Sequence, residues 1–206
     1  MKNSDFKLNQ TLANSKNLIN WIIENLEDLE ISKNEINISK SVILYDMAIE
    51  HFFGIVHLID ANICGSAFAL LRVETESLVR GGWLQFVAKK SEIESFINND
   101  RYKLPKFKTL VESINLVSEF SDINILELTN NSWSSMNSFT HGGTLPVNRR
   151  LVNNRVQPKY ESEVIIEVLK MSGTLALIAL RQISRIAGNS DLTKEIDKML
   201  TGKINT

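Results

Sequence analysis

Residues 70–83 read LLRVETESLVRGGW and carry a charged stripe through an apolar segment. Arg72, Glu76 and Arg80 follow one another at intervals of four residues. Side chains four residues apart are neighbours on an α-helix, so this spacing places one carboxylate between two guanidiniums. Charged side chains rarely occupy such apolar surroundings without partners. The stretch therefore predicts a long helix of a helical bundle that carries a polar site.

Length and composition indicate one domain. The chain has 206 residues, 43% of them hydrophobic, and no Pro-, Gly- or Ser-rich linker divides it. We therefore expect a single helical domain over residues 1–206 with a core at about 9–188. The 23 basic and 24 acidic residues nearly cancel, so the net charge does not indicate a nucleic acid or an anionic membrane as partner. Only a local basic patch could bind such a partner.

The single cysteine and the polar amino terminus favour a cytoplasmic protein. Cys64 has no second thiol to pair with, and residues 1–17 lack the apolar core of a secretory signal. The uncharged run 171–180 is shorter than the roughly 20 residues that a membrane-spanning helix needs. The longer run 42–71 contains Asp46, Glu50 and Asp60. We expect no membrane span.

The spacing of apolar residues predicts an all-α fold, a bundle with long antiparallel helices, because extended alternation is scarce. Pro105 suits a first helical turn, Gly142 suits a helix end, and residues 141–159 have the composition of an irregular, basic segment. The first expected helix is 9–30, and the second is capped by Ser39 and ends at a break near residues 62–65. The other expected helices are 67–89, 92–98, 106–118, 125–139, 161–187 and 192–200.

The charged stripe has two interpretations. As structural bracing, the three side chains would tie neighbouring helices together. As a site, Glu76 would orient Arg72 and Arg80, whose forked donors grip a phosphate or carboxylate through two hydrogen bonds. Glu50 and Glu74 lie off this face and read as ordinary ionic partners.

Two adjacent glycines, Gly81 and Gly82, follow the stripe inside the same helix. Each costs roughly 1 kcal/mol of helix stability relative to alanine, so the pair needs a reason. Close approach of His141 or of a ligand is one reason, and tight packing against Trp133 is the other.

The second candidate segment is NSFTHGG, residues 137–143. Histidine side chains ordinarily titrate near neutral pH, which makes His141 the best candidate for proton transfer. A histidine at a helix end is equally a routine capping residue. In the first interpretation, the candidate phosphate- or ligand-binding residues are Thr140, Gly142, Gly143, Arg149 and Arg150.

Other kinds of site lack a sequence pattern. His51 and His57 are six residues apart on an apolar helix, so we expect core or groove residues. No HExxH, paired HxH or cysteine cluster supports a metal, and no GxGxxG or Walker loop supports a nucleotide, so we predict no metal and no cofactor. Ser138 and Thr140 flank His141 without the spacing that would identify a nucleophile.

The order of three segments resembles that in a group of uncharacterised bacterial all-helical proteins. The segments are AxxLLRxxxExxxRGxWL, a Trp-containing helix ending in THGG, and a long apolar helix. That group is distantly similar to the HEPN superfamily. The resemblance covers about residues 41–187. It rests on Ala67, Leu70, Leu71, Arg72, Glu76, Arg80, Gly81, Trp83, Trp133, Thr140, His141 and Gly142.

A HEPN-like relation implies a dimeric, metal-independent ribonuclease of a toxin or phage-defence system. In that superfamily an arginine precedes the histidine by four to six residues, whereas Ser135, Met136 and Asn137 occupy those positions here. A catalytic arginine would therefore have to be Arg72 or Arg80.

Two hypotheses follow. In the first, the chain is a binding or assembly module of a defence or toxin-type system, with a homodimer formed by apolar helix faces. In the second, the chain cleaves RNA with His141 as acid or base, Arg72 and Arg80 stabilising charge on phosphate, and Glu76 holding them.

Overall fold

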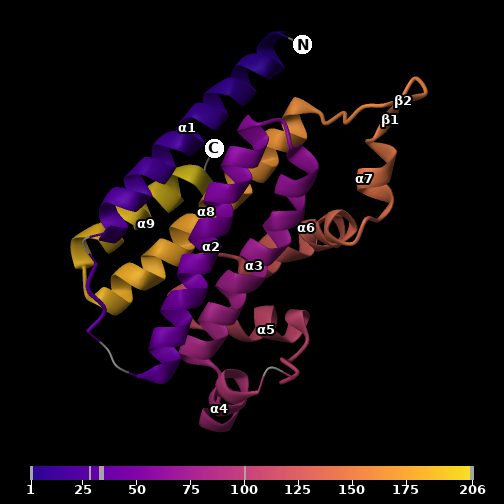
Figure 1. Cartoon of the computed structure of the whole chain (residues 1–206). Coiled ribbons are helices and arrows are strands. Elements are labelled where there is room, and N and C mark those ends of the chain that lie inside the picture. The colour runs from indigo at the N-terminus through magenta and orange to yellow at the C-terminus, as the bar shows by residue number, and fades with distance from the viewer. Residues whose placement is uncertain (1, 28, 33–34, 100, 205–206) are drawn as a thin grey trace.

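The computed structural model describes residues 2–27, 29–32, 35–99 and 101–204 and is almost entirely helical (Figure 1). The described elements, in chain order, are α1 (Lys2–Glu27), α2 (Ile36–Asp60), α3 (Cys64–Phe86), α4 (Lys90–Asn98), α5 (Phe107–Ile114), the 3-10 turn η1 (Ser118–Phe120), α6 (Ile125–Thr140), α7 (Thr144–Asn148), β1 (Leu151–Val152), β2 (Arg155–Val156), α8 (Ser162–Ala187) and α9 (Ser190–Ile204). The prediction of an all-α fold is confirmed.

The glycine pair in α3 makes room for aromatic rings. A Cβ on Gly81 would lie 2.7 Å from Cε1 of Tyr45 on α2, and one on Gly82 would lie 3.1 Å from the Phe120 ring. Tyr45 is fully buried and donates its hydroxyl to Gln85 Oε1 at 2.7 Å. The predictions that His141 or Trp133 approaches the glycines are wrong, because the close neighbours are Tyr45 and Phe120.

The long helices do not all run antiparallel to their neighbours. α2 and α3 form an antiparallel pair joined by the turn at residues 61–63, and α8 and α9 form another (Figure 1). α1 and α8, however, run in the same direction. Ser4 donates to Glu163 Oε1 at 2.5 Å where both helices begin, and Trp21 and Thr174 line one pocket further along. The prediction of antiparallel long helices is therefore wrong for this pair.

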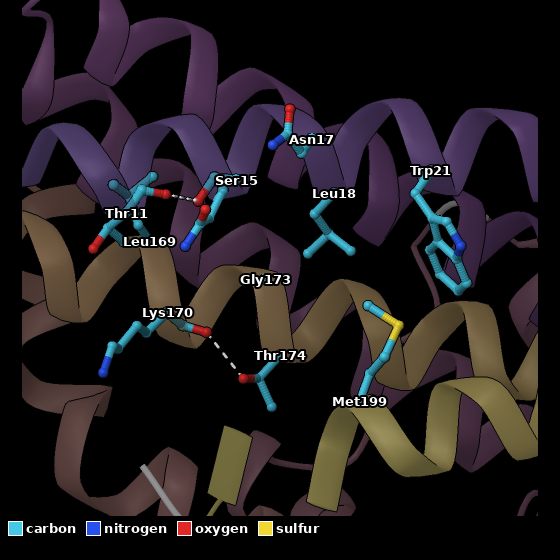
Figure 2. Close-up of a pocket in the computed structure, with 11 residues that line it drawn as sticks. Thr11, Ser15, Asn17, Leu18, Trp21, Leu169, Lys170, Gly173, Thr174 and Met199 are labelled. Atoms are coloured by element: carbon cyan, nitrogen blue, oxygen red, sulfur yellow. Dashed lines mark hydrogen bonds between the residues drawn. The ribbon is translucent and has the colours of Figure 1, made fainter. Parts of the chain in front are cut away.

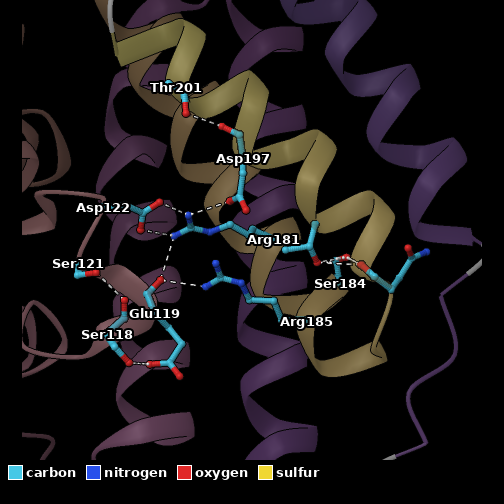
Figure 3. Close-up of polar contacts among 11 residues, drawn as sticks. Ser118, Glu119, Ser121, Asp122, Arg181, Ser184, Arg185, Asp197 and Thr201 are labelled. Carbon is cyan, nitrogen blue, oxygen red and sulfur yellow. Dashed lines mark hydrogen bonds and ion pairs between the residues drawn. The ribbon is translucent and has the colours of Figure 1, made fainter.

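A buried arginine joins α8 to α9 and to η1 (Figure 3). The Arg181 side chain is fully buried, and its Nη1 lies 2.5 Å from Asp122 Oδ2 and 3.2 Å from Asp197 Oδ1. Its Nη2 donates to the carbonyl oxygen of Glu119 at 3.0 Å. Arg185 Nη1 donates to the same carbonyl oxygen at 3.1 Å. These contacts attach three segments at one point, and the sequence analysis did not identify them.

Residues 141–159 are more regular than predicted. They contain the short helix α7 and a two-stranded antiparallel hairpin in which Leu151 pairs with Val156. Asn153 and Asn154 form its turn with φ angles of 48° and 60°, the left-handed conformation of a two-residue hairpin turn. Asparagine tolerates this conformation, so the NN dipeptide was a turn signal that the sequence analysis did not use.

Several helices begin or end at other residues than predicted. The first helix was expected over 9–30 but ends at Glu27, and residue 28 lies outside the described residues. The helix expected over 106–118 ends at Ile114 and is followed by η1. Pro105 precedes the α5 N-cap residue Lys106 instead of lying in the first turn.

One outward stripe of α2 is apolar. Ile36, Ile43 and Met47 lie at spacings typical of one helix face and are 52%, 49% and 38% exposed. Among the described residues, α2 is the one helix long and apolar enough to cross a membrane by length and composition. In its most apolar window, 44% is buried inside the bundle.

Candidate functional site

Four of the predicted site residues meet where α6 ends against α3. Arg72 Nε donates to Glu76 Oε1 at 2.8 Å, and Arg80 Nη2 donates to Glu76 Oε2 at 2.5 Å. Arg72 Nη1 contacts Nε2 of His141, the residue that caps the end of α6. The contact joins residues 69 positions apart in the sequence. The structure thus assembles one polar cluster, defined here as Arg72, Glu76, Arg80 and His141.

The Arg72 contact places a donor beside the histidine ring. A guanidinium has donors only, and an imidazole nitrogen accepts a hydrogen bond when it carries no proton. Arg72 Nη1 and His141 Nε2 are therefore suited to a hydrogen bond in which the guanidinium donates. This arrangement presents an imidazole beside a permanently charged guanidinium.

An aromatic pair forms one side of the cluster. The Arg72 guanidinium carbon lies 5.1 Å from the centre of the Trp133 ring, which is within cation–π range. Trp133 of α6 stacks on Phe107 of α5 with 3.9 Å between ring centres and 7° between ring planes. A small pocket of about 100 Å³ adjoins these two rings and is also lined by Lys108 and Asn130.

The cluster is open to solvent and has an excess of positive charge. The side chains of Arg72, Glu76 and Arg80 are 21%, 15% and 35% exposed, and His141 is exposed. Two guanidiniums share one carboxylate, so one positive charge is uncompensated. Arg80 Nε is buried, and no partner for it is found among the described residues. The exposed parts of the Arg72 and Arg80 guanidiniums can donate further hydrogen bonds to an anion.

The remaining residues of the THGG segment position His141. Thr140 Oγ1 donates to the carbonyl oxygens of Met136 at 2.9 Å and of Ala69 at 3.3 Å, which ties the end of α6 to α3. Gly142 has a φ of +65°, the left-handed conformation that ends many helices. A Cβ on Gly143 would lie 2.6 Å from Ser138 Oγ. Thr140 therefore contacts α3 and α6, and Gly143 packs against Ser138 of α6.

The two predicted basic residues beyond α7 contact other parts of the chain. Arg149 Nε lies 3.7 Å from Glu161 Oε2, and its guanidinium lies 5.7 Å from the Phe139 ring centre. A Cβ on Gly65 would lie 2.8 Å from Arg150 Nη2. No contact with the cluster is found for either arginine among the described residues. The Tyr160 hydroxyl approaches Gly65 equally closely, because the same Cβ would lie 2.8 Å from it.

Glu74 was interpreted as an ordinary ionic partner, and that interpretation is wrong. Its side chain is fully buried, its Oε2 accepts from Ser172 Oγ at 2.6 Å, and its Oε1 has no partner among the described residues. Burial raises the pKa of Glu74 well above its usual value, and the Ser172 hydrogen bond opposes this only in part. The sequence pattern indicates that Glu74 is buried, because Leu71, Glu74 and Leu78 share one buried helix face.

The other histidines do not join the cluster through any described contact. His51 is partly buried, its Nε2 has no described partner, and burial lowers its pKa. His57 is exposed, so the expectation of a core or groove position is wrong for it. Among the described residues, no group of three or more His, Cys, Asp or Glu side chains could hold a metal ion.

Comparison with known proteins identifies a family but no activity. No curated protein and no solved structure matches the chain. A family model described as a family of unknown function, DUF6988, matches residues 45–202, which include α3, α6 and the whole polar cluster. The chain belongs to this family of unknown function.

Proposed function

We propose that the chain is a binding module that holds a phosphate group of single-stranded RNA at the polar cluster. The observation that carries the proposal is the convergence of His141 on an Arg/Glu/Arg ladder with an excess positive charge. Guanidinium donors match phosphate oxygens in geometry and charge. The Trp133–Phe107 pair beside Arg72 offers an aromatic surface of the kind on which nucleic-acid bases stack.

The resemblance to the uncharacterised helical group rests on residues that include all four members of the cluster. The distant similarity of that group to HEPN proteins favours RNA over other phosphate-bearing ligands. We extend the proposal on this basis to a cytoplasmic protein of a bacterial defence or toxin-type system. The exposed apolar stripe of Ile36, Ile43 and Met47 supports the further prediction of a homodimer.

Replacing Arg72 or Arg80 by glutamine is expected to weaken binding of a single-stranded RNA oligonucleotide about tenfold each. A hydrogen bond to a charged group contributes about 1.5–3 kcal/mol, and about 1.4 kcal/mol corresponds to tenfold in affinity. Fluorescence anisotropy at several salt concentrations measures the loss, and the salt dependence of binding should fall because one phosphate contact is removed.

Arg101→Gln is the matched control, because Arg101 is exposed, follows α4 and makes no described contact with the cluster. This variant should bind RNA like the wild type. Equal affinity of Arg72→Gln, Arg80→Gln and the wild type would contradict the binding proposal.

Cleavage of the bound RNA is the second candidate function, and the position of the His141 ring beside Arg72 favours it. In this reaction the imidazole accepts the proton of a ribose 2′-hydroxyl, the 2′-oxygen attacks the adjacent phosphorus, and the bond from phosphorus to the 5′-oxygen breaks. A proton returns to the departing 5′-oxygen, and the arginines stabilise the charge on the phosphorane. Binding of the phosphate to Arg72 would release Nε2 of His141 for this role.

His141→Gln is expected to lower the cleavage rate by roughly a hundredfold or more, the usual contribution of a positioned acid or base. Glutamine retains an acceptor for Arg72, so circular dichroism should show the same folded structure as for the wild type. Gel analysis should show no product from the same oligonucleotide when it carries 2′-deoxyribose. Cleavage of RNA by His141→Gln at the wild-type rate would contradict a catalytic role and leave the binding proposal in place.

A further inference from the structure

A second candidate site lies between α1, α8 and α9 (Figure 2). The pocket has a volume of about 500 Å³, within the range of about 300–1,000 Å³ that is typical of small-molecule sites. It shares no lining residue with the polar cluster. An inference about this pocket therefore does not rest on the proposed function.

The pocket has an apolar body formed by all three helices. Leu18 and Leu169 are buried in its wall, and Trp21 and Met199 are partly exposed to it. Gly173 contributes backbone without a side chain to the α8 side. These apolar residues share the lining with six polar ones, Thr11, Asn14, Ser15, Asn17, Lys170 and Thr174.

The three lining hydroxyl groups donate within their own helices. Thr11 Oγ1 donates to the carbonyl oxygen of Lys7 at 2.9 Å, and Ser15 Oγ donates to that of Thr11 at 3.0 Å. Thr174 Oγ1 donates to the carbonyl oxygen of Lys170 at 2.9 Å. Lys170 is the charged residue of the lining, and its ammonium group has no ion pair or hydrogen bond with the described side chains. The charged donor that the pocket offers to a ligand is thus the Lys170 ammonium group.

The cationic group lies at the opposite end of the pocket from Trp21 and Met199 (Figure 2). Figure 2 shows Lys170 and Thr11 at one end, and Trp21 and Met199 at the other. Thr11 and Trp21 are ten residues apart on α1, which corresponds to roughly 15 Å along the helix axis. The pocket is therefore elongated, with an apolar end and a positively charged end.

We propose that this pocket binds an amphipathic carboxylate of the fatty-acid type. Its hydrocarbon chain lies along Leu18 and Leu169 toward Trp21 and Met199, and its carboxylate pairs with Lys170. The chain buries apolar surface, which supplies most of the affinity, and the ion pair sets the orientation. The proposal assigns α1 a role in ligand binding, although α1 precedes the residues that the family model matches.

Isothermal titration calorimetry of the full chain with dodecanoate, below its critical micelle concentration, tests the proposal. We expect saturable binding that Lys170→Met weakens about three- to fivefold, the usual effect of a solvent-accessible ion pair. Lys198→Met is the matched control, since Lys198 is an exposed α9 residue that does not line the pocket. Arg72→Gln should bind dodecanoate normally, which separates this site from the polar cluster.

Trp21 provides an optical signal for the same site. Dodecanoate should change the tryptophan fluorescence of the wild type but not that of Trp21→Phe, although Trp83 and Trp133 remain. Thr174→Trp should fill the pocket and abolish binding. Absence of saturable binding would overturn the proposal, as would equal affinities of Lys170→Met and Lys198→Met or an unchanged fluorescence response in Trp21→Phe.

Discussion

Arg181→Ala is expected to lower the free energy of unfolding by about 3 kcal/mol, the lower end of the range for breaking a buried ion pair. The Arg181 side chain is fully buried, and its removal leaves space unfilled between α8, α9 and η1. The carbonyl oxygen of Glu119 also loses a charged donor. Asp122 and Asp197 have side chains 56% and 41% exposed, so their carboxylates regain water and limit the loss.

Urea denaturation followed by circular dichroism measures this loss, and two further variants separate its causes. Arg181→Met keeps much of the side-chain volume and should recover part of the stability, because the unfilled space is smaller. Arg185→Ala removes a single hydrogen bond from a charged donor to the same carbonyl oxygen, worth about 1.5 kcal/mol. If Arg181→Ala cost no more than Arg185→Ala, the buried network would not join these three segments as described.

The helices were predictable because their signals are local. Apolar residues recur at helical spacing along α1, α2, α3 and α8, and this periodicity gives each helix its type and approximate bounds. Helix direction was not predictable for α1 and α8. These helices are separated by more than 130 residues, and no local signal encodes how such distant segments pack.

The candidate site was predictable in part, for the same physical reason. The Arg72, Glu76 and Arg80 ladder follows from spacing within one helix. The contact between His141 and Arg72 depends on how α6 packs on α3, and only the structure shows this packing. Arg149 and Arg150 read as ligand-binding residues only because they are basic and close to His141 in sequence, and their contacts lie elsewhere.

Glu74→Gln is expected to stabilise the protein increasingly as the pH rises above about 4.3, the ordinary pKa of a glutamate. Burial raises the pKa of Glu74 in the folded state, so between the two pKa values the folded protein binds more protons than the unfolded chain. The unfolding free energy of the wild type therefore decreases as the pH rises through this interval. Glutamine carries no charge at any of these pH values and keeps an oxygen to accept from Ser172.

Urea denaturation of both proteins between pH 4 and pH 8 tests this expectation. The stability difference should grow by about 1.4 kcal/mol for each pH unit until it passes the folded-state pKa, and then stay constant. Glu167→Gln, an exposed substitution on α8, should follow the wild-type curve. In the Ser172→Ala background, the pH interval over which the stability difference grows should extend to higher pH. This substitution removes the hydrogen bond that lowers the pKa of Glu74. If the unfolding free energies of Glu74→Gln and the wild type changed in parallel with pH, the pKa of Glu74 would be the same in the folded and unfolded states. A contact other than the Ser172 hydrogen bond would then stabilise the buried carboxylate.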